Sequence, residues 1–171
     1  MDRVKSLIRD VPDFPKPGIM FKDITPVLAD GPALATVIKT LAARYATQKP
    51  THIVGVESRG FIFGAALALA MGVGFVPLRK PGKLPYKKRK REYLLEYGKD
   101  AIEIHEDALK KGDRVVLVDD LIATGGTAKA GAELIRDLGA EVIEVAFVVE
   151  LAFLKGREKL AGEKVFSLIT Y

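Results

Sequence analysis

The fold is decided at residues 115–127, which read Val-Val-Leu-Val-Asp-Asp-Leu-Ile-Ala-Thr-Gly-Gly-Thr. Four consecutive apolar residues open the stretch, a pattern typical of a strand buried on both faces of a parallel sheet. Two carboxylates and a glycine turn follow, and residues 128–138 then have the character of a helix. The stretch therefore predicts a strand, a loop and a helix of an α/β protein.

The polar residues of this stretch suit a sugar phosphate. Asp119 and Asp120 follow the apolar run, and ligands of open α/β sheets bind at the carboxyl ends of strands. Ionised carboxylates only accept hydrogen bonds, so they suit the hydroxyls of a ribose diol. Gly125 and Gly126 allow a tight turn and a close backbone approach, and the start of the next helix attracts a phosphate. The pattern predicts a pentose-phosphate site.

The rest of the chain alternates strands with helices, which predicts a parallel sheet with helices on both faces. Residues 11–26 carry four prolines and a glycine, and we expect an ordered loop there. Residues 92–97 and 101–105 favour a hairpin. The expected helices are residues 2–9, 32–45, 61–71, 128–138 and a short polar one after 150, and the expected strands are 52–56, 74–78, 115–118, 142–149 and 165–170.

Composition limits the classes of function. A length of 171 residues fits one domain, residues 1–171. The chain has no cysteine, which excludes disulfides and thiolate metal sites and is compatible with the cytoplasm. His52 and His105 are isolated, so a histidine metal site is not expected. No signal-peptide pattern and no membrane-spanning apolar stretch occur, so we expect a cytoplasmic protein without a membrane partner.

Positive charge is concentrated in one segment. The chain has a net charge of +5, and residues 79–91 contain eight basic residues and no acidic one. Such a concentration attracts polyanions. Nucleic acid, acidic lipid and a multiply phosphorylated small molecule all fit this charge, and the pattern at residues 115–127 favours the last.

Residues 115–127 resemble the signature of the type I phosphoribosyltransferase family. The resemblance implies that fold: a mainly parallel central sheet flanked by helices, with a small hood formed by the N-terminal segment and a flexible β-hairpin loop. It implies that Asp119 and Asp120 hold the ribose hydroxyls of phosphoribosyl pyrophosphate. The 5′-phosphate would bind to the loop after them: Ala123, Thr124, Gly125, Gly126 and Thr127.

Two other loops would carry the pyrophosphate group. Arg59 follows the strand at residues 52–56, and by itself it fits a surface arginine in a turn better than a ligand. The family resemblance implies pyrophosphate binding there, with a cis peptide bond at Glu57–Ser58. Lys80 and Lys83 are the further candidate ligands. Residues 79–100 would form the flexible catalytic loop, although residues 87–91 fit a solvated tip as well.

Three more segments resemble the members of the family that use adenine: residues 14–26, 93–99 and 149–160. The hood would include residues 10–26 and 150–160. Phe21 and Leu151 would cover the two faces of the base, although both also fit an ordinary core. Backbone groups of Met20, Phe21 and Lys22 would read its edge. Glu96 would be the catalytic acid–base group at N7.

The resemblance implies transfer of the phosphoribosyl group from phosphoribosyl pyrophosphate to N9 of adenine, giving AMP and pyrophosphate in purine salvage. The cofactor would be Mg²⁺, held by the substrate without direct protein ligands. A homodimer is implied, with the Arg79 region near the partner. Two alternatives stay open: another purine as substrate, or a regulator that binds phosphoribosyl pyrophosphate. Nucleic acid is not the expected partner, although residues 87–91 are more basic than relatives usually are.

Overall fold

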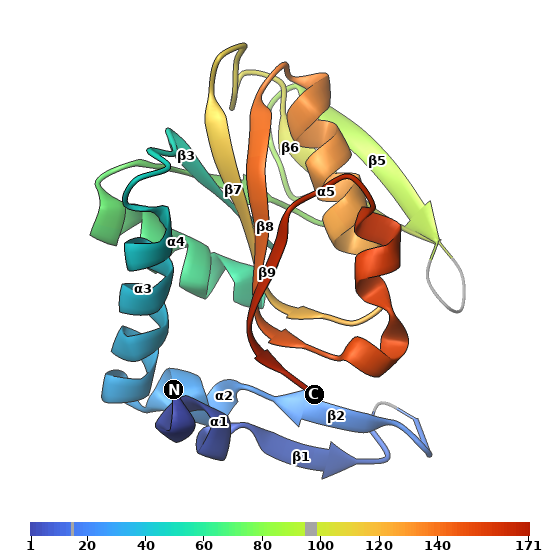
Figure 1. The fold of residues 1–171 in the computed structure, drawn as a ribbon. Coiled ribbons are helices and arrows are strands. Elements are labelled where there is room, and N and C mark those ends of the chain that lie inside the picture. Colours follow the sequence, from blue (N-terminus) through green and yellow to red (C-terminus); the bar gives the residue numbers. More distant parts are fainter. Residues whose placement is uncertain (15, 95–98) are drawn as a thin grey trace.

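A five-stranded parallel sheet forms the centre of the protein (Figure 1). The computed structural model describes residues 1–14, 16–94 and 99–171. The strand order is β4-β3-β7-β8-β9, so the strand of the acidic pair is central. The strands are β3 (His52–Val56), β4 (Gly74–Leu78), β7 (Arg114–Ile122), β8 (Glu141–Glu150) and β9 (Val165–Thr170).

Helices cover both faces of this sheet, as predicted. Helices α3 (Gly31–Tyr45) and α4 (Arg59–Met71) lie on one face, and α5 (Gly126–Asp137) lies on the other (Figure 1). Alternate residues of β7 serve the two cores: Val116 and Val118 pack on the α3–α4 side, whereas Val115 and Leu117 pack on the α5 side. Two apolar layers therefore hold β7 rigidly, and its carboxyl end emerges between them.

Helix boundaries follow local chemistry. The Asp30 side chain accepts a hydrogen bond of 2.8 Å from the Ala33 N–H and so caps α3, which also has a proline in its first turn. Gly72 ends α4 in the left-handed conformation, with a φ of 67°. Within the described residues, no helix combines the length and apolar character needed to cross a bilayer.

The N-terminal segment differs from the prediction. The expected helix is α1 (Asp2–Leu7), but residues 11–26 are not one loop. Strands β1 (Arg9–Pro12) and β2 (Met20–Asp23) form an antiparallel hairpin, and the short helix α2 (Thr25–Ala29) follows. Charged pairs across the hairpin stabilise it: Arg9 with Asp23, and Lys22 with Asp10. Neither strand has a buried residue: β1 is largely exposed and β2 largely half-buried, so no apolar alternation marked them in the sequence.

A second hairpin, β5 (Lys88–Leu94) with β6 (Lys99–His105), confirms the predicted pairing. The first strand of the hairpin was expected to begin at residue 92. It begins earlier, because residues 88–91 of the basic segment are part of β5. Strand β7 also runs four residues past Val118, through the acidic pair to Ile122. It does so because Leu121 and Ile122 continue the pairing with β8.

The C-terminal part contains two short 3₁₀ helices where one polar helix was predicted. These are η1 (Ala152–Leu154) and η2 (Gly156–Leu160), separated by Lys155 with a φ of 53°. Backbone hydrogen bonds fix the segment: Leu151 N–H donates to Ile122 at 3.0 Å, and Ala152 N–H donates to Tyr171 at 2.9 Å. The segment after β8 is thereby fastened to the carboxyl end of β7.

Candidate functional site

Two adjoining cavities open at the carboxyl edge of the sheet. One has a volume of about 210 Å³ and surrounds the loop after β7. The other has a volume of about 260 Å³ and lies among the ends of β3, β4 and β7. Both are lined by Asp119, Leu121 and Thr127, so they form one continuous site. Arg59, Lys80 and Asp120 complete the second cavity, and Ala123 to Gly126 complete the first.

The loop of residues 123–127 packs closely against the backbone of Gly156. Gly125 has a φ of 77°, and a Cβ atom there would lie 2.3 Å from the carbonyl oxygen of Gly156. A Cβ at Gly156 would in turn lie 2.3 Å from the carbonyl oxygen of Ala123. Only glycine fits at both positions. The interlock fixes the loop at the start of α5, where free N–H groups and the helix dipole favour a phosphate.

The two carboxylates have different surroundings. Asp120 is 6% exposed and pairs with Arg59, whose Nε lies 2.6 Å from its Oδ2. Asp119 accepts the Asp120 N–H at 2.8 Å and faces the helix start, where a Cβ at Gly60 would lie 2.8 Å from its Oδ1. Burial raises the pKa of Asp119, and the neighbouring Asp120 charge raises it further. The site thus holds one carboxylate that resists ionisation beside one that is ion-paired.

Arg59 begins α4 directly after the loop that follows β3. The peptide bond Glu57–Ser58 in this loop is cis, which confirms the expectation for it. The Arg59 guanidinium lies 5.8 Å from the centre of the Phe21 ring. This contact brings strand β2 of the N-terminal hairpin to the edge of the sheet that carries Asp120.

Glu57 organises the cationic side of the site. Its carboxylate accepts the Lys80 N–H at 2.9 Å and lies 3.0 Å from the Lys83 ammonium and 3.3 Å from the Arg79 guanidinium. Burial by itself would raise the pKa of Glu57, but these partners outweigh it and lower the pKa to about 2. A Glu57 carboxylate that is ionised at neutral pH therefore holds the loop after β4 in place.

Lys80 is held by two further groups. Its ammonium donates to the Tyr93 hydroxyl at 2.8 Å and pairs with Asp100. The Tyr93 hydroxyl in turn donates to Asp100 at 3.0 Å. Both partners belong to the β5–β6 hairpin, so the hairpin determines the position of the Lys80 ammonium group.

The structure brings some predicted residues together and leaves others apart. Arg59, Lys80, Asp119, Asp120 and residues 123–127 surround one site. Lys83 is half-exposed on Glu57 and lines neither cavity. Of the residues predicted to bind a base, Met20 is exposed, Phe21 is half-buried, Lys22 pairs with Asp10 beside the Tyr171 ring, and Leu151 is buried in the core. None of these four lines the two cavities. Glu96 lies outside the described residues.

Sequence reasoning missed four residues of the site. Glu57 had a usable signal, because an acid directly after a buried strand lies at the ligand edge. Tyr93 and Asp100 had none, since their contact with Lys80 joins segments that only the fold brings together. Gly156 looked like an ordinary turn residue, and its contact with the loop at Ala123 appears only in three dimensions.

The acidic side chains fit a hard cation that arrives with its ligand. No cluster of three or more His, Cys, Asp or Glu side chains that could hold a metal occurs among the described residues. Two aspartates at one cavity supply the oxygen atoms that Mg²⁺ prefers, and Mg²⁺ commonly binds through one or two carboxylates and substrate phosphates. The residues present therefore fit Mg²⁺ held mainly by a phosphorylated substrate.

Comparison with known proteins gives a consistent result. Residues 27–167 match the family model described as phosphoribosyl transferase domain. The adenine phosphoribosyltransferase of Syntrophotalea carbinolica is 57% identical over 171 residues, all of both chains.

Solved structures agree with the sequence matches. The adenine phosphoribosyltransferase of Thermoanaerobacter pseudethanolicus is 54% identical and superposes with a TM-score of 0.96 over 99% of both chains. The Saccharomyces cerevisiae adenine phosphoribosyltransferase, solved with an imino-altritol bisphosphate and adenine, is 45% identical with a TM-score of 0.94, over 98% of this chain and 97% of that one. The chain resembles these proteins over its whole length, including the loops that form the site.

Proposed function

The chain belongs to the adenine phosphoribosyltransferases, and on that premise we propose which of its residues convert adenine and phosphoribosyl pyrophosphate into AMP and pyrophosphate. The reaction is a pentosyl transfer of purine salvage. N9 of adenine attacks the anomeric carbon, and pyrophosphate leaves. Positive charge develops on the ribose and negative charge on the leaving group, so the enzyme has to stabilise both.

One observation carries the assignment of roles. Asp119 lines the cavity of the 123–127 loop and also the cavity of Arg59 and Lys80. A ligand with a phosphate at one end and a pyrophosphate at the other therefore places its ribose over the aspartates. We assign the 5′-phosphate to residues 123–127, the ribose hydroxyls to Asp119 and Asp120, and the pyrophosphate to Arg59 and Lys80. Lys83 lines neither cavity, and we propose it as a further pyrophosphate ligand because Glu57 pairs with it next to Lys80.

The aspartates also act on the transition state. Their carboxylates oppose the positive charge that develops on the ribose. Arg59 and Lys80 oppose the negative charge on the leaving pyrophosphate, and each is already held in position, by Asp120 and by Tyr93 with Asp100. Mg²⁺, when it is bound through the pyrophosphate, supplies further charge neutralisation and needs no direct protein ligand.

Adenine would bind under the hood formed by residues 10–26 and 150–160. Phe21 reaches the site through its contact with Arg59, and Leu151 is fastened to the end of β7. These two side chains would cover the faces of the base, with backbone groups of Met20 to Lys22 at its edge. Glu96, on the loop of residues 79–100, would hold the proton at N7. The whole chain, residues 1–171, would form this single domain.

We also propose a homodimer, and helix α4 supports it. Residues 61–71 contain no polar side chain, so both faces of the helix are apolar. One face packs inside, yet Ile62 and Leu69 on the other are 43% and 84% exposed. A second copy of the chain would cover this face. A cytoplasmic location follows from the substrate, because phosphoribosyl pyrophosphate is a polyanion that cannot cross a bilayer.

The deciding experiment is AMP formation from adenine and phosphoribosyl pyrophosphate with Mg²⁺, with hypoxanthine and guanine as competing bases. We expect turnover with adenine alone. Glu96→Gln should reduce turnover by about 10²-fold or more, because a general acid–base group is lost, while the KM for phosphoribosyl pyrophosphate changes less than about two-fold.

Glu92→Gln is the matched control, since Glu92 is an exposed glutamate on the same hairpin, and it should behave like the wild type. Equal turnover of Glu96→Gln and wild type would remove Glu96 from the chemistry. Tight binding of phosphoribosyl pyrophosphate without turnover of any base would instead favour the regulator.

A further inference from the structure

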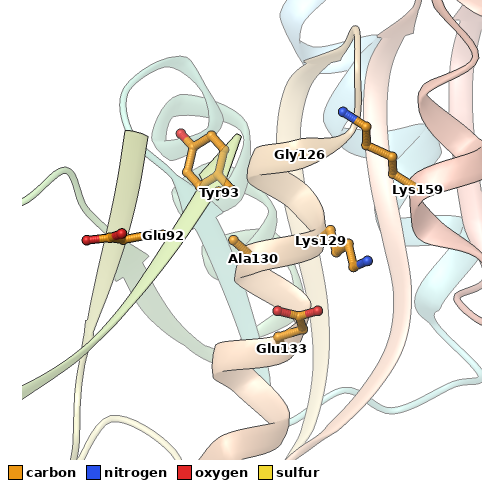
Figure 2. Close-up of a pocket in the computed structure, with 7 residues that line it drawn as sticks. All are labelled: Glu92, Tyr93, Gly126, Lys129, Ala130, Glu133 and Lys159. Carbon is orange, nitrogen blue, oxygen red and sulfur yellow. The ribbon is translucent and has the colours of Figure 1, made fainter. Parts of the chain in front are cut away.

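The basic segment of β5 faces helix α5. Alternate residues of a strand lie on one face, so Arg89, Arg91 and Tyr93 point the same way. Tyr93 packs with Ala130 of α5 in one apolar core and lines a cavity of about 360 Å³ with it. Figure 2 shows Tyr93 at the end of its strand beside the first turn of α5, whereas Glu92 points away from the helix. Strand β5 and α5 therefore lie against each other along their lengths.

Two arginines join the elements at the other end of the helix. Arg89 Nη1 donates to the Asp137 carbonyl oxygen at 2.7 Å, on the last residue of α5. Arg91 pairs with the Asp137 carboxylate, and its Nη1 lies 3.6 Å from Glu133 Oε2. A helix C-terminus carries partial negative charge, which favours cations there. The arginines therefore bind both the side chains and the free carbonyl end of the helix.

The contacts follow a regular register. Going along β5 from Arg89 to Tyr93, the partners on α5 run backwards from Asp137 to Ala130. Two strand residues advance about 6.7 Å and one helical turn about 5.4 Å, so successive inward residues meet successive turns. The start of the same helix follows the loop assigned to the 5′-phosphate. The hairpin is thereby aligned with the element that holds one end of the substrate.

Tyr93 transmits this alignment to the other end of the substrate. Its hydroxyl accepts from the Lys80 ammonium at 2.8 Å and donates to Asp100 at 3.0 Å. We infer that Arg89 and Arg91 are positioning residues that dock β5 on α5 and so fix Tyr93, and through it Lys80, at the pyrophosphate cavity. The inference rests on the pyrophosphate role proposed for Lys80.

The remaining charges of the segment agree with this use. Lys88 Nζ donates to the Leu84 carbonyl at 3.0 Å and lies 3.6 Å from Glu103, and Lys90 lies 3.2 Å from Glu92. All four basic residues at 88–91 thus have partners inside the chain. Their positive charges are used in contacts within the protein, which argues against a role of this segment as a binding surface for nucleic acid.

The test compares the double variant Arg89→Ala, Arg91→Ala with Lys90→Ala, measured on the full chain. The Lys90→Ala substitution removes the same kind of charge from the same strand, but the Lys90 side chain faces away from α5. We expect the double variant to speed amide exchange of residues 88–94 about five-fold and to raise the KM for phosphoribosyl pyrophosphate about five-fold, because half-exposed ion pairs are modest. Lys90→Ala should change either quantity less than two-fold.

Two further measurements separate positioning from general destabilisation. The ratio of the two KM values, variant to wild type, should shrink in 0.5 M salt, which screens the ion pairs that the variant lacks. In a Lys80→Ala background the double substitution should no longer raise the KM. Unchanged exchange, or a KM effect that persists without Lys80, would overturn the inference. A Lys80→Ala enzyme with a normal KM would instead refute the pyrophosphate role proposed for Lys80. The effect of Tyr93 on the pyrophosphate cavity would then be refuted as well. The amide-exchange data would still decide whether Arg89 and Arg91 dock β5 on α5.

Discussion

At the scale of single residues, the candidate site depends on charges that the fold holds in unequal states. Asp119 is a carboxylate whose ionisation is opposed by burial and by Asp120. Asp120 has Arg59 as its partner. Glu57 has the opposite character to Asp119, because three cationic or N–H partners favour its charge. Groups kept in unfavourable states are typical of sites that are completed by a ligand.

Asp119→Asn should therefore separate stability from function. The folded-state pKa of Asp119 is raised, so ionisation disfavours the fold as the pH rises above about 3.8, the ordinary value. At pH 7 the neutral amide should make the free protein more stable, as measured by thermal unfolding. The same change should lower kcat/KM for phosphoribosyl pyrophosphate about 10- to 100-fold, because a charged hydrogen bond to the ribose is lost. Near pH 3 the variant and the wild type should have similar unfolding temperatures. A variant that is less stable than the wild type at pH 7 would contradict this explanation.

Glu57→Gln should change the stability at pH 7 in the opposite direction, by lowering it. The pKa of Glu57 is lowered from 4.5 to about 2, so its contribution to stability is present above pH 4.5 and is lost as the pH falls toward 2. We expect the variant to lose about 2 kcal/mol of unfolding free energy at pH 7 and little near pH 2. Urea unfolding across this pH range measures the difference. Glu106→Gln, at an exposed position, is the control, and a constant difference at all pH values would refute the ionic explanation.

At the scale of elements, the loops of the candidate site are held by contacts with helices and strands from other parts of the chain. The loop at residues 123–127 is held by η2 through the mutual contact of Gly125 and Gly156. Helix α4 reaches the acidic pair because Gly60 has no side chain. The β5–β6 hairpin meets α5 through the arginines of β5. Each loop of the site is therefore positioned by an element distant in sequence.

Gly156→Ala should test the loop interlock. The new methyl group would meet the Ala123 carbonyl at 2.3 Å, and backbone cannot move aside as a flexible side chain can. We expect about 1 to 3 kcal/mol of destabilisation and about a ten-fold higher KM for phosphoribosyl pyrophosphate. Steady-state kinetics and urea unfolding measure both. Gly31→Ala, where a Cβ meets nothing within 4 Å, should leave both close to wild type. An unchanged KM in Gly156→Ala would show that the loop does not depend on η2.

At the scale of the whole molecule, the two faces of the sheet are closed by apolar layers, and the outer face of α4 carries the exposed apolar side chains Ile62 and Leu69. It lies on the helix that begins with Arg59, so an interface there would adjoin the site. This arrangement supports the proposed homodimer.

Leu69→Glu should break that dimer, because it would place a charge in an apolar interface. We expect dimerisation weaker by about 2 kcal/mol or more, measured by sedimentation velocity over a range of concentrations. Phe153→Glu changes another exposed apolar residue, on η1, which is 65% exposed, and should leave the oligomeric state unchanged. A wild type that sediments as a monomer, or a Leu69→Glu variant that dimerises normally, would overturn the proposal.

The sequence by itself determined the parallel sheet and the centre of the site. Segments dominated by apolar residues predicted β3, β4, β8 and β9 within one or two residues, because strands buried in a parallel sheet are rich in apolar side chains. The acidic pair and the glycine loop were readable because the chemistry of ribose and phosphate restricts residue types over a short stretch. The family resemblance, carried by contiguous motifs, led to the adenine enzymes.

Only the tertiary structure decided how the remaining residues are used. The hairpin β1–β2 has no apolar alternation, and charge pairs between its two strands stabilise it. The four residues that prolong β7 depend on its neighbour β8. The partners of Lys80, the close approach of Gly156 and the docking of Arg89 and Arg91 join segments far apart in the chain. Such contacts depend on distances in space, and a pattern of neighbouring residues carries no information about them.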